Sequence, residues 1–285
     1  MHYVEREAPP RLKEQIRCLW SFRGAGSGML EPIVPDGCAE LILHLGTPYS
    51  EMCGTVPQEQ PRALIAGQLT RPLHLVATGP VDVLAVRFEP HGARRFVGRP
   101  MKDMTDKRCP LADLFGHQVA GDLLGTLSRL PTADARFEAA AAFVDRMNGP
   151  PPLEEAAVAN AVRRIAKPRG RVRAEELAKS CELSLRTLER RFADVVGVSP
   201  RALSSIFRVR SLFDELRADP TSGLTQLALA ANWFDHSQMT RDFKRFVGCT
   251  PSAFLAGAPG LAAGLATGDA DGLAGTYKRK RSEAR

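Results

Sequence analysis

Two segments in the second half of the chain repeat one another at a constant offset of 51 residues (234 minus 183). Residues 183–203 (LSLRTLERRFADVVGVSPRAL) align with residues 234–254 (FDHSQMTRDFKRFVGCTPSAF). Self-similarity on this scale indicates that one supersecondary unit is built twice. The repeat therefore limits what the second half can fold into more than any other feature of the sequence.

Each copy carries the signals of a helix with defined ends. Ser184 and Asp235 are residue types that cap helix N-termini, and Gly197 and Gly248 fall where a helix ending in a left-handed residue favours glycine. A Ser-Pro or Thr-Pro pair then starts the next helix. The large apolar side chains recur at helical spacing and predict one buried face per helix; they are Leu188, Phe192, Val195 and Val196, matched by Met239, Phe243, Phe246 and Val247.

A short helix is predicted before each copy, over residues 174–180 and 224–230. Helix, tight turn and helix is the outline of a DNA-binding helix-turn-helix. Any helical bundle contains helix pairs joined by short turns, so one pair alone is weak evidence. Two copies matched in cap, apolar face, glycine and proline favour the DNA-binding interpretation.

The faces opposite the apolar stripes carry side chains that hydrogen-bond to base edges and phosphates. The predicted DNA-binding residues are Arg186, Thr187, Glu189 and Arg190 in the first copy, and His236, Ser237, Gln238, Arg241 and Lys244 in the second. Residues 199–219 read as one connecting helix, which at about 1.5 Å per residue spans roughly 30 Å. That length is compatible with two recognition helices about one DNA turn apart.

The positive charge of the chain lies entirely in its second half. Residues 1–149 hold 17 Lys+Arg and 17 Asp+Glu, whereas residues 150–285 hold 22 and 15, which gives the net charge of +7. A basic half beside a neutral one indicates a polyanion-binding module joined to a module with another task. A solvated basic surface is the alternative, because the Lys-Arg-Lys-Arg run of residues 278–281 supplies four of these charges.

Three consecutive prolines at residues 150–152 mark the expected linker. Before it, residues 29–90 read as short strands broken by turns, and residues 111–130 and 133–147 read as helices. We therefore expect a multi-domain α and β protein. Its predicted parts are a β-rich sensing or dimerisation domain with C-terminal helices (1–149), an all-α domain with two helix-turn-helix subdomains (153–256), and a disordered basic tail (257–285) that is dispensable for specific DNA binding.

Residues 153–255 resemble the AraC/XylS family of bacterial transcription regulators. The resemblance rests on VRAEELAKSCELSLRTLERRF, on the VGVSPRAL junction and on LTQLALAANWFDHSQMTRDFKRFVGCTPSAF, whose ending follows the family signature closely. It implies two helix-turn-helix subdomains joined by a long helix and docked in adjacent major grooves. Carried over by position, it implies base-facing roles for Arg186, Glu189 and Arg190, and for His236, Ser237, Gln238 and Arg241.

This sequence departs from the family pattern in both turns. Glu182 and Asn232 stand where the family usually has glycine, and Trp233 replaces the usual Phe. Asn adopts the left-handed conformation more easily than Glu does. We therefore expect some strain in the first turn.

The N-terminal half resembles, more weakly, an uncharacterised β-rich domain attached to some members of that family. The matching segments are IVPDGCAELILHLG, IAGQLTRPL and VDVLAVRFEPHGARRF. The resemblance implies a cupin-like fold that senses an effector or dimerises.

Other functions remain open for the N-terminal half. His44, His74 and His91 are candidate metal ligands, although the chain lacks the HxH and Glu of a metal-binding cupin. Cys38 could be a reactive thiol, but a small buried residue is the more common role. The alternative function is thus a metal- or thiol-dependent enzyme or redox sensor fused to the DNA-binding module. A packaging protein indifferent to DNA sequence is a third class.

The expected function is a sequence-specific transcription regulator, by default an activator, and not an enzyme. We expect double-stranded DNA and RNA polymerase as partners, a small-molecule effector, a homodimer and no cofactor. The charged N-terminus lacks a signal peptide, and no stretch approaches the roughly 18 apolar residues of a membrane span. Six cysteines without a CxxC pair fit reduced thiols in a cytoplasmic protein.

Overall fold

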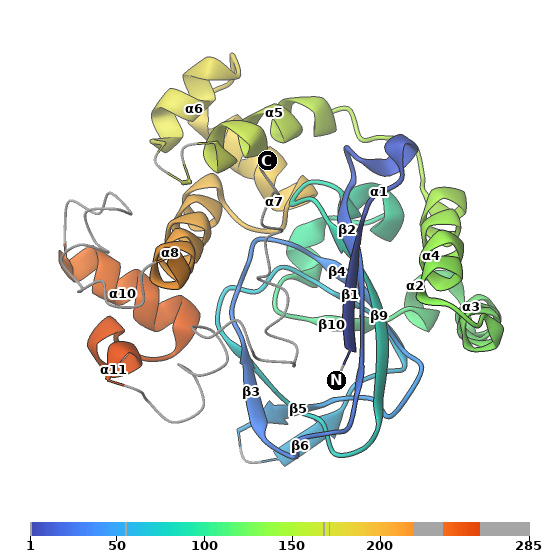
Figure 1. Cartoon of the computed structure of the whole chain (residues 1–285). Helices are drawn as coiled ribbons and strands as arrows, with labels where there is room; N and C mark the ends of the chain where they lie inside the picture. Colours follow the sequence, from blue (N-terminus) through green and yellow to red (C-terminus); the bar gives the residue numbers. More distant parts are fainter. Residues whose placement is uncertain (1, 55, 168, 171, 219–235, 257–285) are drawn as a thin grey trace, which may run out of the picture.

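A computed structural model of the chain describes residues 2–54, 56–167, 169–170, 172–218 and 236–256. Its N-terminal part contains two antiparallel sheets followed by helices, and its C-terminal part is helical (Figure 1). The expected fold class, β-rich first and all-α second, is confirmed. Within the described residues, no helix is long and apolar enough to cross a lipid bilayer.

The larger sheet has six strands in the order β1-β2-β9-β4-β7-β10, and the smaller has four in the order β3-β8-β5-β6. The strands are β1 (His2–Glu7), β2 (Ile16–Gly24), β3 (Leu30–Ile33), β4 (Glu40–His44), β5 (Ser50–Cys53), β6 (Val56–Glu59), β7 (Ala63–Ala66), β8 (Leu73–Val76), β9 (Val81–Phe88) and β10 (Arg108–Pro110). Strands were expected only from residue 29 onward. Strands β1 and β2 precede that residue and were not predicted.

Strand β9 shows how the larger sheet is held on both faces. Leu84, Val86 and Phe88 belong to a core shared with the helices, whereas Val83 and Ala85 belong to a core on the opposite face. Because side chains alternate along a strand, an apolar run buries both of its faces. The sequence VDVLAVRF is therefore an interior strand of the sheet.

The helices after β9 cover one face of this sheet. They are α1 (Ala93–Val97), the 3-10 helix η2 (Met101–Met104), α2 (Ala112–Phe115), α3 (His117–Arg129) and α4 (Ala133–Met147); a further 3-10 helix, η1 (Pro10–Leu12), lies between β1 and β2. Gly116, at φ 88°, separates α2 from α3, so the helix expected over residues 111–130 is two helices. Helix α4 has the expected bounds, and Thr132 caps it by accepting a hydrogen bond from the amide of Ala135.

The C-terminal part is built from six described helices, α5 (Glu155–Ala166), α6 (Ala174–Ser180), α7 (Leu185–Val195), α8 (Pro200–Ala218), α10 (His236–Val247) and α11 (Pro251–Leu255). They share one apolar core, to which Val34 of the N-terminal part also belongs. The helix expected over 224–230, the residues Asn232, Trp233 and Asp235, and the expected tail 257–285 lie outside the described residues.

The proline segment between α4 and α5 forms no helix or strand and runs along the N-terminal part. Asn148 and Gln15 exchange two side-chain hydrogen bonds of 2.7 and 2.8 Å. The amide of Gly149 donates to the carbonyl oxygen of Arg95 at 3.1 Å. The segment expected to act as a linker is therefore anchored at its start.

Candidate nucleic-acid interface

Helices α6 and α7 form the first helix–turn–helix pair, at the bounds expected from the sequence for α6. The turn between them passes through Glu182, whose φ is 56°, so this non-glycine residue does adopt the left-handed conformation. Ser184 then caps α7, since its hydroxyl oxygen accepts a hydrogen bond of 3.2 Å from the amide of Thr187. The cap predicted from the repeat is confirmed, and the strained turn lies where the departure from glycine predicted it.

Helix α7 buries one face and exposes the other. Leu188, Phe192 and Val195 are fully buried in the helical core. Three of the predicted DNA-binding residues, Arg186, Glu189 and Arg190, are exposed, and none forms an ion pair with another described residue. Thr187 is half-buried, and its hydroxyl lies 2.8 Å from that of Ser184.

Helix α10 repeats this arrangement. Met239, Phe243 and Phe246 are buried. The predicted binding residues occupy its first two turns and its outer face: His236 is its first residue, Ser237, Arg241 and Lys244 are exposed, and Gln238 is half-buried.

The ends of the two repeat helices match as well. Gly197 and Gly248 have φ angles of 94° and 93°, the left-handed conformation expected at a helix end. Ser199 and Thr250 then cap the following helices, each hydroxyl accepting a hydrogen bond of 3.2 Å from the amide three residues on. The two copies therefore share the buried stripe, the glycine exit and the cap of the following helix, which is what the repeat predicted.

Helix α8 joins the two units as the expected connecting helix. Its 19 residues span about 28 Å at 1.5 Å per residue. Arg208 of α8 lies 3.6 Å from the carboxylate of Asp242 on α10. Burial lowers the pKa of Arg208, and the Asp242 charge partly offsets this effect.

Aromatic rings fix the second unit against α8. The ring centroid of Phe213 lies 5.9 Å from that of Phe243 and 5.5 Å from that of Phe254. Edge-on and tilted ring pairs at these distances add to the stability from burial alone. The position of α10 on the connecting helix is thus set by packed side chains.

The first helix–turn–helix pair rests on the N-terminal part, a contact that the sequence did not predict. The hydroxyl of Thr105 donates a 2.6 Å hydrogen bond to the carbonyl oxygen of Gly197, at the end of α7. Arg94 of α1 lies 3.2 Å from Asp194 of α7. Arg95 pairs with the buried carboxylate of Glu155 on α5. No sequence signal marks such pairs, whose members are 60 and 100 positions apart.

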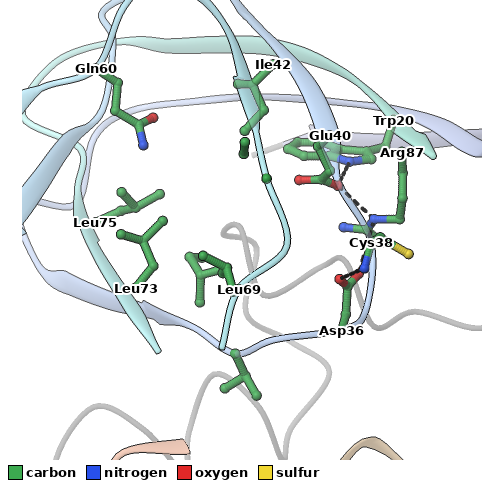
Figure 2. A pocket seen from close by; sticks show the side chains of 14 residues that line it. Trp20, Asp36, Cys38, Glu40, Ile42, Gln60, Leu69, Leu73, Leu75 and Arg87 are labelled. Carbon is green, nitrogen blue, oxygen red and sulfur yellow. Dashed lines mark hydrogen bonds and ion pairs between the residues drawn. The ribbon is translucent and has the colours of Figure 1, made fainter. Parts of the chain in front are cut away.

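A cavity of about 60 Å³ lies between the two sheets (Figure 2). Its lining is mostly apolar, with Trp20 of β2 as the largest side chain and with Asp36, Glu40 and Arg87 as its charged residues. The lining residues are Trp20, Ile33, Val34, Asp36, Cys38, Glu40, Ile42, Gln60, Ala66, Gly67, Leu69, Leu73, Leu75 and Arg87. This site was not predicted from the sequence, although Glu40 and Arg87 stand out there as charged residues inside apolar strand patterns.

The histidines and cysteines singled out in the N-terminal half occupy different surroundings. His44 is buried, and its Nε2 lies 3.3 Å from the side-chain oxygen of Gln60. Desolvation lowers the pKa of His44 to about 4 and also lowers that of His91, while His74 lies in β8. Cys38 lines the cavity, and burial raises the pKa of its thiol. Among the described residues, no group of three or more His, Cys, Asp or Glu side chains is placed to hold a metal ion.

An exposed polar face on the second helix of a helix–turn–helix pair is the surface that this motif places in the major groove, and it indicates the class of DNA-binding proteins. Residues 177–257 match the family model described as a helix-turn-helix domain, and residues 5–110 match the one described as a domain of unknown function, DUF6597. The chain is therefore a DNA-binding transcription regulator with an AraC-type helix-turn-helix domain at its C-terminal end and a DUF6597 domain at its N-terminal end.

Comparison with solved structures finds proteins of similar length but low identity. ToxT from Vibrio cholerae O395 is 10% identical, over 93% of this chain and 98% of that chain, with a TM-score of 0.45. ToxT bound to (E)-4-(8-methylnaphthalen-1-yl)but-3-enoic acid is also 10% identical, over 90% of this chain and 99% of that chain, with the same TM-score of 0.45. The AraC-like transcriptional activator CuxR is 12% identical, over 80% of this chain and 91% of that chain, with a TM-score of 0.27. At these scores the likeness supports no further inference. No curated protein matches the chain.

Proposed function

We propose that this regulator recognises specific DNA sequences by placing α7 and α10 in successive major grooves. The observation that carries the proposal is the matched pair of helices: each has a buried stripe and an exposed polar face, and α8 joins them. In this proposal residues 153–256 form the DNA-binding domain, and residues 1–149 form the sensing or dimerisation domain.

Base recognition is assigned to the exposed faces of the two helices. Arginine pairs with guanine, glutamine with adenine, and serine or threonine with either base, whereas lysine contacts guanine or phosphates. The proposed DNA-contacting residues are Arg186, Thr187, Glu189 and Arg190 on α7, and His236, Ser237, Gln238, Arg241 and Lys244 on α10. The basic excess of this half adds affinity that falls as the salt concentration rises.

Control by a small-molecule effector is the second part of the proposal. The cavity in the N-terminal part is the candidate effector site, because it joins apolar walls to a few convergent polar groups, as ligand pockets do. We expect effector binding to set the affinity of a homodimer for its operator, and the bound protein to activate transcription by contacting RNA polymerase.

Selection from a randomised duplex pool with the full-length chain tests DNA recognition. We expect an enriched consensus with two conserved blocks about one helical turn apart, because successive major-groove faces recur at that spacing. A pool that remains random after selection would show that the protein binds DNA without regard to sequence.

Arginine variants then test the assigned contacts. Arg190→Ala or Arg241→Ala should weaken binding to the selected duplex by about 1–3 kcal/mol and relax the preference at one base position. Arg129→Ala, which removes an exposed arginine of α3, is the matched control and should bind as the unmodified chain does. Equal losses on selected and scrambled duplexes would instead identify phosphate contacts.

A further inference from the structure

The cavity between the two sheets has an excess of negative charge. Its three charged residues are Asp36, Glu40 and Arg87, so the lining carries a formal charge of −1. The nearby pair of Arg17 and Glu89, at 3.0 Å, is neutral in itself. An anionic ligand would therefore meet one uncompensated carboxylate, whereas a cationic ligand would neutralise it.

The guanidinium of Arg87 is buried and paired with two carboxylates of the protein. Only 4% of its side chain is exposed, and its Nε lies 2.7 Å from Glu40 and 3.4 Å from Asp36. Desolvation opposes its charge, but these two carboxylates outweigh that effect and hold the pKa of Arg87 above its usual value. Arg87 thus stays charged, and the surplus charge of the lining belongs to the carboxylates.

Glu40 offers an acceptor to a ligand. Its Oε1 accepts hydrogen bonds from Nε1 of Trp20 at 3.0 Å and from Nε of Arg87 at 2.7 Å. Its Oε2 accepts none from the residues that the structure describes, and in Figure 2 this oxygen points toward the middle of the cavity. A carboxylate oxygen placed among apolar side chains favours a charged N–H donor over a neutral one.

The rest of the lining determines the shape of such a ligand. Leu69, Leu73 and Leu75 face Glu40 across the cavity, and Ile42 lies beside Glu40 on β4 (Figure 2). The volume of about 60 Å³ is less than half of the roughly 150 Å³ that holds benzene in an engineered apolar cavity. A compact aliphatic body with one positively charged end fits these walls.

A short segment, residues 34–38, connects the cavity to the DNA-binding half. Val34, Asp36 and Cys38 line the cavity, whereas Gly37 between them turns toward α8. With φ of 81°, Gly37 is packed so closely that a methyl group on it would lie 2.8 Å from a ring carbon of Phe207. A ligand that displaced this segment would press on the helix that joins the two recognition helices.

From these contacts we infer that the effector is a small aliphatic amine, bound as its ammonium ion by Glu40. The inference rests on the proposed function, because it names the ligand class of the proposed effector site. The segment 34–38 transmits occupancy of the cavity to α8 and so to the spacing of α7 and α10.

Three matched probe series test the ligand class on the full-length chain at pH 7.5 and constant ionic strength. Methylamine, ethylamine and isopropylamine are compared with alcohols and carboxylates of the same carbon skeletons by calorimetry and thermal unfolding. We expect at least one amine to bind saturably and raise the Tm, its alcohol to bind at least tenfold more weakly, and the carboxylates not to bind. Carboxylate binding as tight as amine binding, or no binding by any amine, would overturn the inference.

Variants locate the binding. Glu40→Gln should abolish the preference for amine over alcohol, whereas Glu59→Gln, an exposed carboxylate of β6, should keep it. Should Glu40→Gln not fold, Leu73→Phe keeps every charge and narrows the cavity, so it should weaken amine binding at least tenfold. An amine affinity that Leu73→Phe leaves unchanged would place the binding outside the cavity and refute the assignment.

Two outcomes separate the ligand class from the proposed function. A consensus from the duplex selection together with no amine binding refutes only the ligand class, whereas absence of any consensus refutes the DNA-recognition proposal. A bound amine should also change the Kd for the selected duplex at least threefold. An unchanged Kd would refute transmission through residues 34–38.

Discussion

Arg87 stands in the apolar strand β9, and its guanidinium is nearly inaccessible and is held between Glu40 and Asp36. A buried charge of this kind is tolerated only with close partners, because desolvation of an unpaired ion costs several kcal/mol. Its presence in the strand could have been noticed in the sequence, but its partners, 47 positions away in the case of Glu40, could not.

The surroundings of the cysteines predict unequal thiol reactivity. Cys18 and Cys38 are buried, and desolvation raises the pKa of Cys18 to about 12, whereas Cys53 is exposed. Because the thiolate is the reactive form, we expect Cys18 and Cys38 to resist a disulfide reagent at pH 8 while Cys53 reacts. Mass spectrometry of the labelled native protein checks this, with Cys53→Ser as the control. Fast labelling of Cys38 would restore the thiol-sensor alternative.

His44 predicts a loss of stability in mild acid. Burial lowers its folded-state pKa to about 4, and nearby Arg62 acts in the same direction. The unfolded chain, with a histidine pKa near 6.5, therefore binds more protons between pH 6.5 and 4, so stability falls as the pH falls through this window. The His44 contribution is on the order of 3 kcal/mol. Urea unfolding should show a weaker pH dependence in His44→Gln, and the wild-type dependence in His117→Gln, where the histidine is exposed.

At the scale of elements, the two repeat helices end in the same conformation but in different surroundings. Gly197 and Gly248 share a φ near 93°, yet a methyl group on Gly197 would lie 2.8 Å from the carbonyl oxygen of Met101, whereas one on Gly248 would only approach Pro72 at 3.3 Å. The repeat explains why both residues are glycine. The contact with η2 is a second reason why position 197 requires glycine, and the repeat does not reveal it.

This difference predicts unequal effects of one substitution. Gly248→Ala should lower the free energy of unfolding by about 1–2 kcal/mol, the strain of a left-handed alanine. Gly197→Ala should cost about 2–4 kcal/mol, because overpacking against Met101 is added. Chemical denaturation of both variants checks the order. Equal losses would mean that η2 moves away from α7 at little cost.

At the scale of the whole molecule, the helices of the C-terminal part pack against the N-terminal part and are not joined to it by a linker alone. Asp194 and Gly197 of the first unit, Glu155 of α5 and the Gln15–Asn148 pair all contact or anchor it. Cavity and helices are therefore parts of one packed body, which is compatible with the proposed control of DNA binding by an effector.

The ion pair between Arg95 and Glu155 joins the N-terminal part to α5 of the helical part and should contribute to the free energy of unfolding. Glu155 is 7% exposed and accepts hydrogen bonds from the guanidinium at 2.7 Å. Glu155→Gln should therefore lower the free energy of unfolding by about 1–3 kcal/mol, since a charged hydrogen bond is replaced by a neutral one. Glu59→Gln, with an exposed side chain, is the control and should change little. A Glu155→Gln variant as stable as this control would show that the pair adds nothing to adhesion.

The sequence by itself determined the local elements of this protein. Caps, apolar stripes, glycine exits and the repeat predicted α4, α6, α7 and α8, because these signals act between residues a few positions apart. The strand pattern likewise predicted β9 at its observed bounds. Only the tertiary structure decided which distant side chains meet. These contacts are the enclosure of Arg87, the close approach of Gly37 to Phe207 and the packing of α7 against η2. They join residues 47 to 170 positions apart, and contacts over such separations produce no periodic pattern in the sequence.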